Sequence, residues 1–382
     1  MTSSAPSTGA TDVAVVGGGP IGLATAWRLA GAGASVTVFD PAPDRGAWRV
    51  AAGMLAPVTE VHYGEEPLLG LNLESAALYP AFCAELEDAT GLSCGYRSCG
   101  TLAVAADNDD LAALRDLQAF QERLGLEVAR LSSRQCRAMV PSLSPSVRGG
   151  LHVAGDHQVD PRRLVGALRE ACSVAGVRLV REAVVRLDSA RGRVAAVVTA
   201  HDAHPCAAVV VAAGAWSGLV DGLATMVPVR PVKGQVVRLA GADPDLIGLN
   251  LRALVAGSSV YLVPRADGEV VIGATVEEKA YDPRVTAGAV HDLLRDSWSV
   301  VPELRELEVA ELSAGFRPGT PDNAPLIGPA APVGVFLATG HYRNGVLLTP
   351  VTAQAVATAV LTGRIPDVVA PFSPLRFGER AA

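Results

Sequence analysis

Residues 12–23 read Asp12-Val-Ala-Val-Val-Gly17-Gly-Gly19-Pro-Ile-Gly22-Leu23, and this stretch decides the fold. The apolar run before Gly17 is typical of a buried parallel strand. Gly17 permits a tight turn, Gly19 lets a phosphate approach the backbone, and Gly22 lets the next helix pack closely on the strand. The pattern therefore predicts a strand–turn–helix unit that seats the pyrophosphate of a dinucleotide.

The residues that follow support a dinucleotide ligand. A helix predicted over 21–32 directs its free N–H groups and positive dipole end at the pyrophosphate, and Pro20 fits the first turn of that helix. A second strand, 35–39, ends at Asp40, which lies 18 residues after Gly22. A carboxylate there accepts hydrogen bonds from the adenosine ribose and would repel the 2′-phosphate of NADP. A glycine turn without a ligand is the alternative that this context disfavours.

A second glycine-rich stretch occurs near the C-terminus. It reads Thr339-Gly340-His-Tyr-Arg-Asn-Gly345-Val346 and follows an apolar run that begins at Val335. Backbone amides in such a turn can reach another part of the same ligand. The two turns together predict one long ligand and a chain that returns to its starting sheet.

The order of the helix and strand signals predicts the fold class. The α/β signals lie at the start, middle and end of the 382-residue chain, and antiparallel signals lie between them. This order predicts an α/β plus α+β fold, in which a Rossmann-like domain of three segments carries an inserted, mostly antiparallel β domain. The nucleotide-binding domain is expected at 1–78, 148–218 and 311–382, and the substrate domain at 79–147 and 219–310. Helices are expected at about 70–91, 109–125, 161–175 and 285–299, and short strands at 177–180 and 183–187.

Composition excludes several classes of protein. The net charge is −7 without a basic cluster, which disfavours a nucleic-acid partner. No apolar run is long enough to span a bilayer, and residues 1–11 are expected to be disordered and lack the features of a signal peptide. The six cysteines form no CxxC pair, so free thiols in a reducing cytoplasm are expected. His201 and His204 are interpreted as a polar surface turn, and no metal site is predicted.

Eight stretches, taken together, resemble one family. The chain resembles the FAD-dependent amino-acid and amine oxidases of the D-amino-acid oxidase class, and within them it is most similar to the glycine oxidases of thiamine biosynthesis. The stretches that carry the resemblance are VAVVGGGPIGLATAWRLA, AAGMLAPVTE, HQVDPRRLVGAL, VVVAAGAWSG, PVKGQ, YLVPRADGEVVIGAT, GFRPGTPDNAPLIGP and GHYRNGVLLTP. They follow one another in the order expected for the family and span nearly the whole chain.

The resemblance implies FAD as the cofactor. A covalent link is not expected, because no cysteine follows Cys206. The implied isoalloxazine site lies near Ala52, and the segment 341–347 lies under the pyrimidine side of the flavin. Its backbone amides can stabilise negative charge that develops there on reduction. The full set of implied cofactor residues is Gly17, Gly19, Pro20, Ile21, Gly22, Asp40, Pro41, Ala47, Trp48, Ala52, Gly53, Met54, Val185, Gly340, His341, Tyr342, Arg343, Asn344, Gly345, Val346 and Leu347.

The resemblance also implies a substrate site. A substrate carboxylate needs a cation in a dry pocket, and Arg317 matches the arginine that supplies it in the family. Tyr261 matches an assisting tyrosine, and Arg343 matches an arginine near the substrate. Lys233 is a weaker candidate for a residue near the flavin. No catalytic general base is expected, since hydride transfer from a neutral amine needs none.

The implied reaction is oxidative deamination of glycine, with sarcosine and small D-amino acids as further substrates, O2 as acceptor and H2O2 as product. A homo-oligomer, tetrameric by resemblance, is also implied. The chain departs from glycine oxidases at Val276, Ser259 and residues 47–50, so the substrate stays open. The alternatives are a broader D-amino-acid or secondary-amine oxidase or dehydrogenase, a tRNA-modifying flavin enzyme, and a non-catalytic FAD module.

Overall fold

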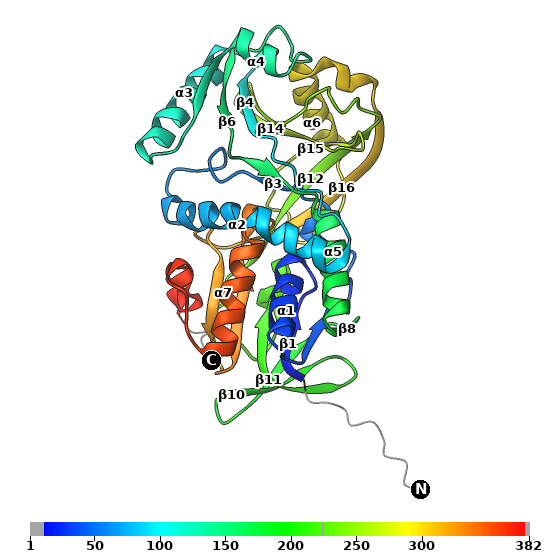
Figure 1. The fold of residues 1–382 in the computed structure, drawn as a ribbon, viewed down its shortest axis with the longest axis vertical. Coiled ribbons are helices and arrows are strands. Elements are labelled where there is room, and N and C mark those ends of the chain that lie inside the picture. Colours follow the sequence, from blue (N-terminus) through cyan, green and yellow to red (C-terminus); the bar gives the residue numbers. More distant parts are fainter. Residues whose placement is uncertain (1–10, 224, 379–382) are drawn as a thin grey trace.

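The computed structural model describes residues 11–223 and 225–378, which form two sheets with their helices. Figure 1 shows the first sheet with α1, α5 and α7 in the lower half, and the second sheet with α3, α4 and α6 in the upper half. Helix α2 (Glu66–Thr90) crosses between them. The disorder predicted for residues 1–11 lies outside the described residues, apart from Thr11, which begins the first strand.

The first sheet has a parallel centre with an antiparallel strand at one edge. Its main path runs β17-β18-β11-β1-β2-β8, and β10 and β9 extend from β11 as an antiparallel hairpin. β1 pairs in parallel with β2 on one side and β11 on the other, and β11 pairs in parallel with β18. The strands are β1 (Thr11–Val16), β2 (Val36–Phe39), β8 (Arg178–Val180), β9 (Arg186–Ala190), β10 (Arg193–Val198), β11 (Ala203–Val211), β17 (Leu326–Ala330) and β18 (Val335–Thr339). Segments from the start, the middle and the end of the chain therefore share one sheet, as predicted.

The two faces of this sheet are covered differently. Alternate residues of β1 point to opposite faces, so Val13 and Val15 join one apolar cluster while Ala14 and Val16 join another. The first cluster lies under helices, and the second lies under the β9–β10 hairpin. The helices are α1 (Pro20–Gly31), α5 (Pro161–Val174) and α7 (Thr349–Thr362).

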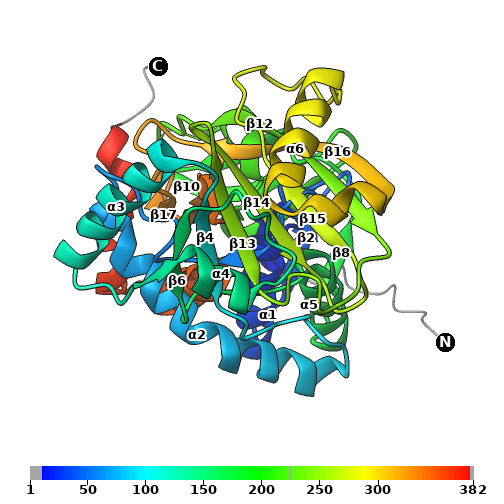
Figure 2. The same cartoon turned by 90° about the horizontal axis from the view of Figure 1, so that it is seen from above.

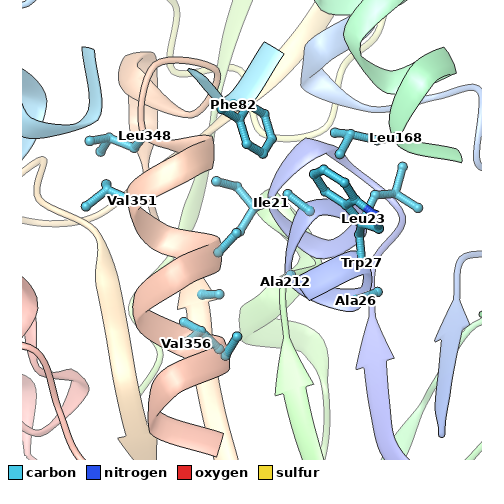
Figure 3. Close-up of a cluster of buried hydrophobic side chains, with 14 of the residues drawn as sticks. Ile21, Leu23, Ala26, Trp27, Phe82, Leu168, Ala212, Leu348, Val351 and Val356 are labelled. Carbon is cyan, nitrogen blue, oxygen red and sulfur yellow. The ribbon is translucent and has the colours of Figure 1, made fainter. Parts of the chain in front are cut away.

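Figure 3 shows the centre of the helix-covered core. Ile21 of α1 faces α7, which carries Val351, whereas Trp27 lies beside Phe82 of α2 with the two ring centroids 6.0 Å apart, and all four residues belong to one buried cluster. Burial of each large apolar side chain stabilises the fold by about 1.5–3 kcal/mol. The packing fixes the N-terminus of α1 relative to the segment that precedes α7.

The second sheet is mostly antiparallel. Its order is β16-β12-β15-β14-β13-β4-β6-β5, with one parallel pair, β13 and β4. Figure 2, seen from above, places β13 and β14 across the middle of the view, with α2 and α6 at opposite edges. The strands are β4 (Thr101–Ala105), β5 (Ala129–Ser132), β6 (Gly149–Val153), β12 (Arg230–Ala240), β13 (Asn250–Val255), β14 (Ser258–Pro264), β15 (Val270–Gly273) and β16 (Glu308–Gly319). The helices are α3 (Asn108–Arg123), α4 (Ser133–Met139) and α6 (Ala287–Val300), and β3 (Met54–Leu55) pairs with β7 (His157–Gln158) as a separate ribbon.

The fold class is as predicted, and three of the predicted domain boundaries can be compared with the helices and strands. The 78/79 boundary cuts α2 and the 310/311 boundary cuts β16, although both elements are continuous. The 147/148 boundary assigns β6 to the nucleotide-binding domain, whereas β6 pairs with β4 and β5 in the second sheet. We propose boundaries after Thr90, after Val153 and after Gly319, so that β16 stays with β12 in the second sheet. The strand expected at 183–187 is β9, which begins at Arg186 and ends at Ala190.

Three sequence expectations concern features outside the sheets. The six cysteines are free thiols, and five of them are buried. The described residues contain no group of three or more metal-ligating side chains, so His201 and His204 form no such cluster there. In the same residues no single helix is long and apolar enough to cross a membrane, although α7 and residues 367–377 would pass by length and composition as a bent pair.

Candidate cofactor and substrate site

In the first glycine turn, Gly17 and Gly22 pack against backbone carbonyls, whereas Gly19 faces open space that a ligand can fill. Gly17 has a φ of +108°, and a Cβ there would overlap the Ala212 carbonyl oxygen. A Cβ at Gly22 would overlap the Gly17 carbonyl oxygen. At Gly19 the nearest atom is Cδ1 of Trp48, 3.9 Å away, so the backbone is open where α1 begins. The turn therefore fits a pyrophosphate against the helix N-terminus.

Asp40 lies at the C-terminal end of β2 and faces this turn. Its Oδ2 accepts a hydrogen bond from the Gly18 N–H at 2.7 Å, and its Oδ1 accepts one from Ala42 at 2.8 Å. A carboxylate has about four acceptor sites, so ribose hydroxyls can still donate to it. Trp48, on the short 3-10 helix Ala47–Arg49, is buried beside the turn, with the Arg169 guanidinium 5.4 Å from its ring.

The segment predicted to contact the flavin ring is held through its carbonyl groups. Three arginines from other segments donate to carbonyls of residues 49–52. Arg162 Nε donates to Arg49 O at 3.0 Å, and Arg238 Nη2 lies 3.3 Å from Arg49 O and 3.4 Å from Ala51 O. Arg265 Nη2 donates to Ala52 O. Burial lowers the pKa of Arg265 to about 10, which still keeps it charged at neutral pH. Gly53 has a φ of +77°, and a Cβ there would overlap the Val159 carbonyl oxygen. The carbonyls of Arg49, Ala51 and Ala52 therefore already accept hydrogen bonds from the protein.

The C-terminal turn is held by α2 and α7. Ser75 Oγ donates to Leu347 O and Tyr79 Oη donates to Val346 O, each at 2.6 Å. His341 Nε2 lies 3.0 Å from Thr352 Oγ1, and burial lowers the pKa of His341 to about 3, so the ring is neutral. Because the two carbonyls face α2, the turn is fixed in one orientation.

One acceptor in this turn is free. Within the described ranges, Oδ1 of Asn344 is buried and has no hydrogen-bond partner. A buried polar atom without a partner is costly, so a bound group that donates to it would remove that cost. Together with the open backbone at Gly19, this atom shows that the residues present fit a long nucleotide cofactor.

Arg317 presents a guanidinium that no acid neutralises within the described part of the chain. On β16, its Nη1 donates to Thr275 O at 3.0 Å and to Lys233 O at 3.4 Å. A Cβ at Gly234 would overlap the guanidinium, which explains the glycine in the stretch PVKGQ. Across residues 11–223 and 225–378, Arg317 has no carboxylate partner.

Tyr261 lies between Arg317 and residues 52–54, which are predicted to contact the flavin ring. Its ring packs with Ala52 and Met54 in a small apolar cluster, and its hydroxyl end lies against Gly273. Burial raises the pKa of Tyr261, and the charge of Arg317 opposes that rise. Tyr261 is therefore a neutral donor at physiological pH, close enough to Arg317 for the two to interact.

Arg343 differs from Arg317 because it already has an anionic partner. Its Nη2 forms an ion pair with Oε2 of Glu65. Oε1 of Glu65 accepts a hydrogen bond from Asn323 Nδ2 at 2.9 Å. Nε of Arg343 is buried and has no partner in the described ranges, so the guanidinium keeps a donor for a further ligand.

Four further candidates have surroundings that the sequence did not reveal. The N–H of Val185 donates to Val198 O and its carbonyl accepts from Asp221, so its backbone is already bonded. Lys233 is buried in β12, not solvated in a turn, and its Nζ donates to Arg284 O at 2.6 Å. Val276 is 66% exposed, at the rim beside Thr275, and Ser259 is exposed on β14.

Sequence reasoning missed most residues that support the site. Asp156 is fully buried and accepts from Val58 N at 3.1 Å and from both Thr59 N and Oγ1 at 2.7 Å, which fixes the residues after β3. Burial raises its pKa to about 6. Ser75 and Tyr79 lie within a helical pattern that carries no sign of their hydrogen bonds to the C-terminal turn. The arginines offered a weak signal, since Arg238 and Arg265 are charges inside or next to strongly apolar strands.

Comparisons with known proteins identify the family of the chain. Residues 12–359 match the family model described as DAO, FAD dependent oxidoreductase. The chain is 34% identical over 372 residues to a glycine oxidase of Geobacillus kaustophilus, covering 96% of this chain and 97% of that protein. The crystal structure of glycine oxidase from that organism superposes with a TM-score of 0.88, covering 96% of this chain and 98% of that chain.

A bifunctional protein ThiO/ThiG of Trichormus variabilis is also 34% identical, over 373 residues and 97% of this chain. The chain spans about half of the length of that bifunctional relative, namely 56%. The matched residues include the glycine turn, both candidate arginines and the C-terminal turn. By sequence and fold, the chain belongs to the DAO family of FAD-dependent oxidoreductases.

Proposed function

We propose that this protein oxidises glycine and other small amino acids to imino acids, with O2 as the electron acceptor and H2O2 as the product. The family membership supports FAD-dependent chemistry, and the name of one relative, glycine oxidase, supports a small amino acid as substrate. On the same basis we propose that the product supplies thiazole synthesis in thiamine formation.

The observation that carries the proposal is the guanidinium of Arg317. It is oriented by two backbone carbonyls, lies in space left open by Gly234, and has no carboxylate partner among the described residues. A cation held in this way is suited to a ligand carboxylate, since charge-assisted hydrogen bonds are about twice as strong as neutral ones.

The surrounding residues have distinct roles in the proposed reaction. FAD, when bound, accepts the two electrons released as the substrate loses hydride from its α-carbon. Arg317 and the Tyr261 hydroxyl hold the carboxylate, while Met54 and Ala52 give Tyr261 an apolar wall. The backbone of 345–347 presents its amides opposite the carbonyls that Ser75 and Tyr79 hold, where they can stabilise negative charge. The chain's contribution is positioning and electrostatics.

The direct test is an anaerobic flavin spectrum of the purified protein before and after glycine. We expect the yellow absorbance to bleach with glycine and to return with air as H2O2 forms. If glycine, sarcosine and D-alanine all leave the spectrum unchanged, the proposal is wrong. Return of colour only with an artificial dye would identify a dehydrogenase instead of an oxidase.

Removal of the carboxylate-binding cation gives the sharpest variant. Arg317→Ala removes a charge-assisted contact of about 1.5–3 kcal/mol, so we expect the apparent KM for glycine to rise about tenfold or more. FAD content should be unchanged, because Arg317 is not among the cofactor candidates. Arg134→Ala, at an exposed position on α4, is the matched control and should keep the wild-type KM. Unchanged kinetics in Arg317→Ala would exclude this residue as the carboxylate site.

A broader amine oxidase is the second candidate, and one observation favours it. Val276 is 66% exposed at the rim next to Thr275, whose carbonyl orients Arg317. A small exposed side chain leaves that edge of the site open to larger substrates. A higher kcat/KM for sarcosine or D-alanine than for glycine would favour this second candidate.

A further inference from the structure

The two candidate substrate arginines differ in whether a neighbouring acid neutralises their charge. Among the residues that the structure describes, Arg317 has carbonyl partners but no acidic one, whereas Arg343 is paired with Glu65. Both members of the Arg343–Glu65 pair are largely shielded, with side-chain exposures of 19% and 14%. Asn323 fixes the other oxygen of Glu65, so the acid is held from two sides. Because water screens this ion pair less than an exposed one, Glu65 neutralises the charge of Arg343 more completely than a surface acid would.

The pair belongs to the same region as Arg317. The short 3-10 helix η4 (Tyr342–Asn344), which carries Arg343, contacts β16, which carries Arg317. A second pair, Glu60 and Arg252, has an Nη1–Oε1 distance of 2.5 Å, and Arg252 is the cross-strand partner of Tyr261. Glu60 and Glu65 both lie on the segment that joins β3 to α2, so this segment brings two acids to the substrate side.

We propose that Glu65 is a specificity-determining residue that restricts the site to substrates with a single carboxylate. This inference rests on the proposed function, in which Arg317 holds the substrate carboxylate. Glu65 stands where the second carboxylate of a larger substrate would bind Arg343. The site therefore offers one uncompensated cation and repels a second anion, although it contains two arginines.

The isosteric variant Glu65→Gln tests this inference. It keeps an acceptor for Asn323 but removes the charge, which frees Arg343 for a second substrate carboxylate. D-aspartate and D-asparagine have nearly the same shape and differ in that charge, so their kcat/KM ratio isolates it. We expect the D-aspartate to D-asparagine ratio to rise at least tenfold in Glu65→Gln. Glu66→Gln, which removes the same charge from the adjacent exposed residue, should leave the ratio within about twofold.

A binding measurement without turnover separates this inference from the proposed function. Calorimetric titration of the holoenzyme with malonate and with acetate compares a dicarboxylate with a monocarboxylate. In Glu65→Gln we expect malonate to gain at least tenfold in affinity relative to acetate, whether or not glycine reduces the flavin. Failure of the proposed function appears in the flavin spectrum with amino acids, and failure of this inference appears in the malonate to acetate ratio.

A second variant covers the case in which Glu65→Gln does not fold. Asn323→Gly removes the amide that fixes Glu65 and is compatible with the φ of +57° at that position. It should raise the malonate to acetate ratio in the same direction by a smaller factor. An unchanged ratio in the folded variant, or an equal change in Glu66→Gln, would overturn the inference, since the second result would show only a long-range effect of net charge.

Discussion

The two ends of the cofactor site are built by different means. At residues 17–22 the turn is fixed by backbone sterics, because neighbouring carbonyl oxygens leave no room for a Cβ at Gly17 or Gly22. At residues 340–347 the turn is fixed by side chains of α2 and α7, including Ser75 and Tyr79. One end therefore depends on a few adjacent residues, and the other depends on helices packed in the core. The two ends should respond differently to substitution.

A methyl group at the first end should have the largest effect. Gly17→Ala places a Cβ against the Ala212 carbonyl and forces a φ of +108° on alanine, so we expect a loss of about 3 kcal/mol or more in the free energy of unfolding. FAD should be lost on gel filtration. Gly31→Ala is the matched control, because nothing lies within 4 Å of its Cβ position. Full FAD content in Gly17→Ala would show that backbone sterics do not govern this end.

Loss of one side-chain anchor at the second end should have a smaller effect. Tyr79→Phe leaves the buried Val346 carbonyl without its 2.6 Å hydrogen bond, which costs about 1–3 kcal/mol. Chemical denaturation should show this loss, with FAD still bound and exchanging faster. Tyr63→Phe removes the hydroxyl of a 60% exposed tyrosine and should change the free energy of unfolding by less than about 0.5 kcal/mol. Equal losses in the two variants would contradict a specific anchoring role.

The smallest effect is a pH dependence at the second end. The pKa of His341 is lowered to about 3, so the unfolded chain binds more protons here than the folded chain between about pH 3 and 6.5. The contribution of the neutral His341 ring to the free energy of unfolding is therefore fully present above about pH 6.5 and is lost as the pH falls toward 3. Between pH 7.5 and 5.5 the wild type should lose about 1.4 kcal/mol more than His341→Gln. Denaturation curves at the two pH values measure the difference, and parallel losses would show that His341 titrates normally.

The same contrast explains what the sequence could predict. Gly17, Gly22 and Asp40 act on neighbours close in sequence, so a stretch of about thirty residues is enough to predict the strand–turn–helix unit. The role of Tyr79 depends on a partner 267 residues away, and no periodicity carries that information. The FAD cofactor and the family were predicted by resemblance and are confirmed by the comparisons. The individual site residues stay predictions.

Some supporting residues were hidden because polar groups in a core have no sequence pattern of their own. Asp156 and Arg265 lie next to apolar strands, where a charge usually indicates a strand end at the surface. Their burial follows from the long-range contacts that satisfy them, such as the bonds from Thr59 and to Ala52. Glu65 was missed for the same reason, since only the fold brings it to Arg343.

The first sheet combines strands from the start, the middle and the end of the chain, and this has a consequence for protein synthesis. β1 leaves the ribosome first, but its neighbour β11 (Ala203–Val211) and the next strand β18 (Val335–Thr339) follow much later. Pairing strands so far apart in sequence is slow, and the unpaired edge of β1 and β2 is exposed in the meantime. The second end of the cofactor site forms only after residue 347 has emerged. We therefore expect tight FAD retention to appear late in translation, and nascent chains truncated before β18 to depend on chaperones.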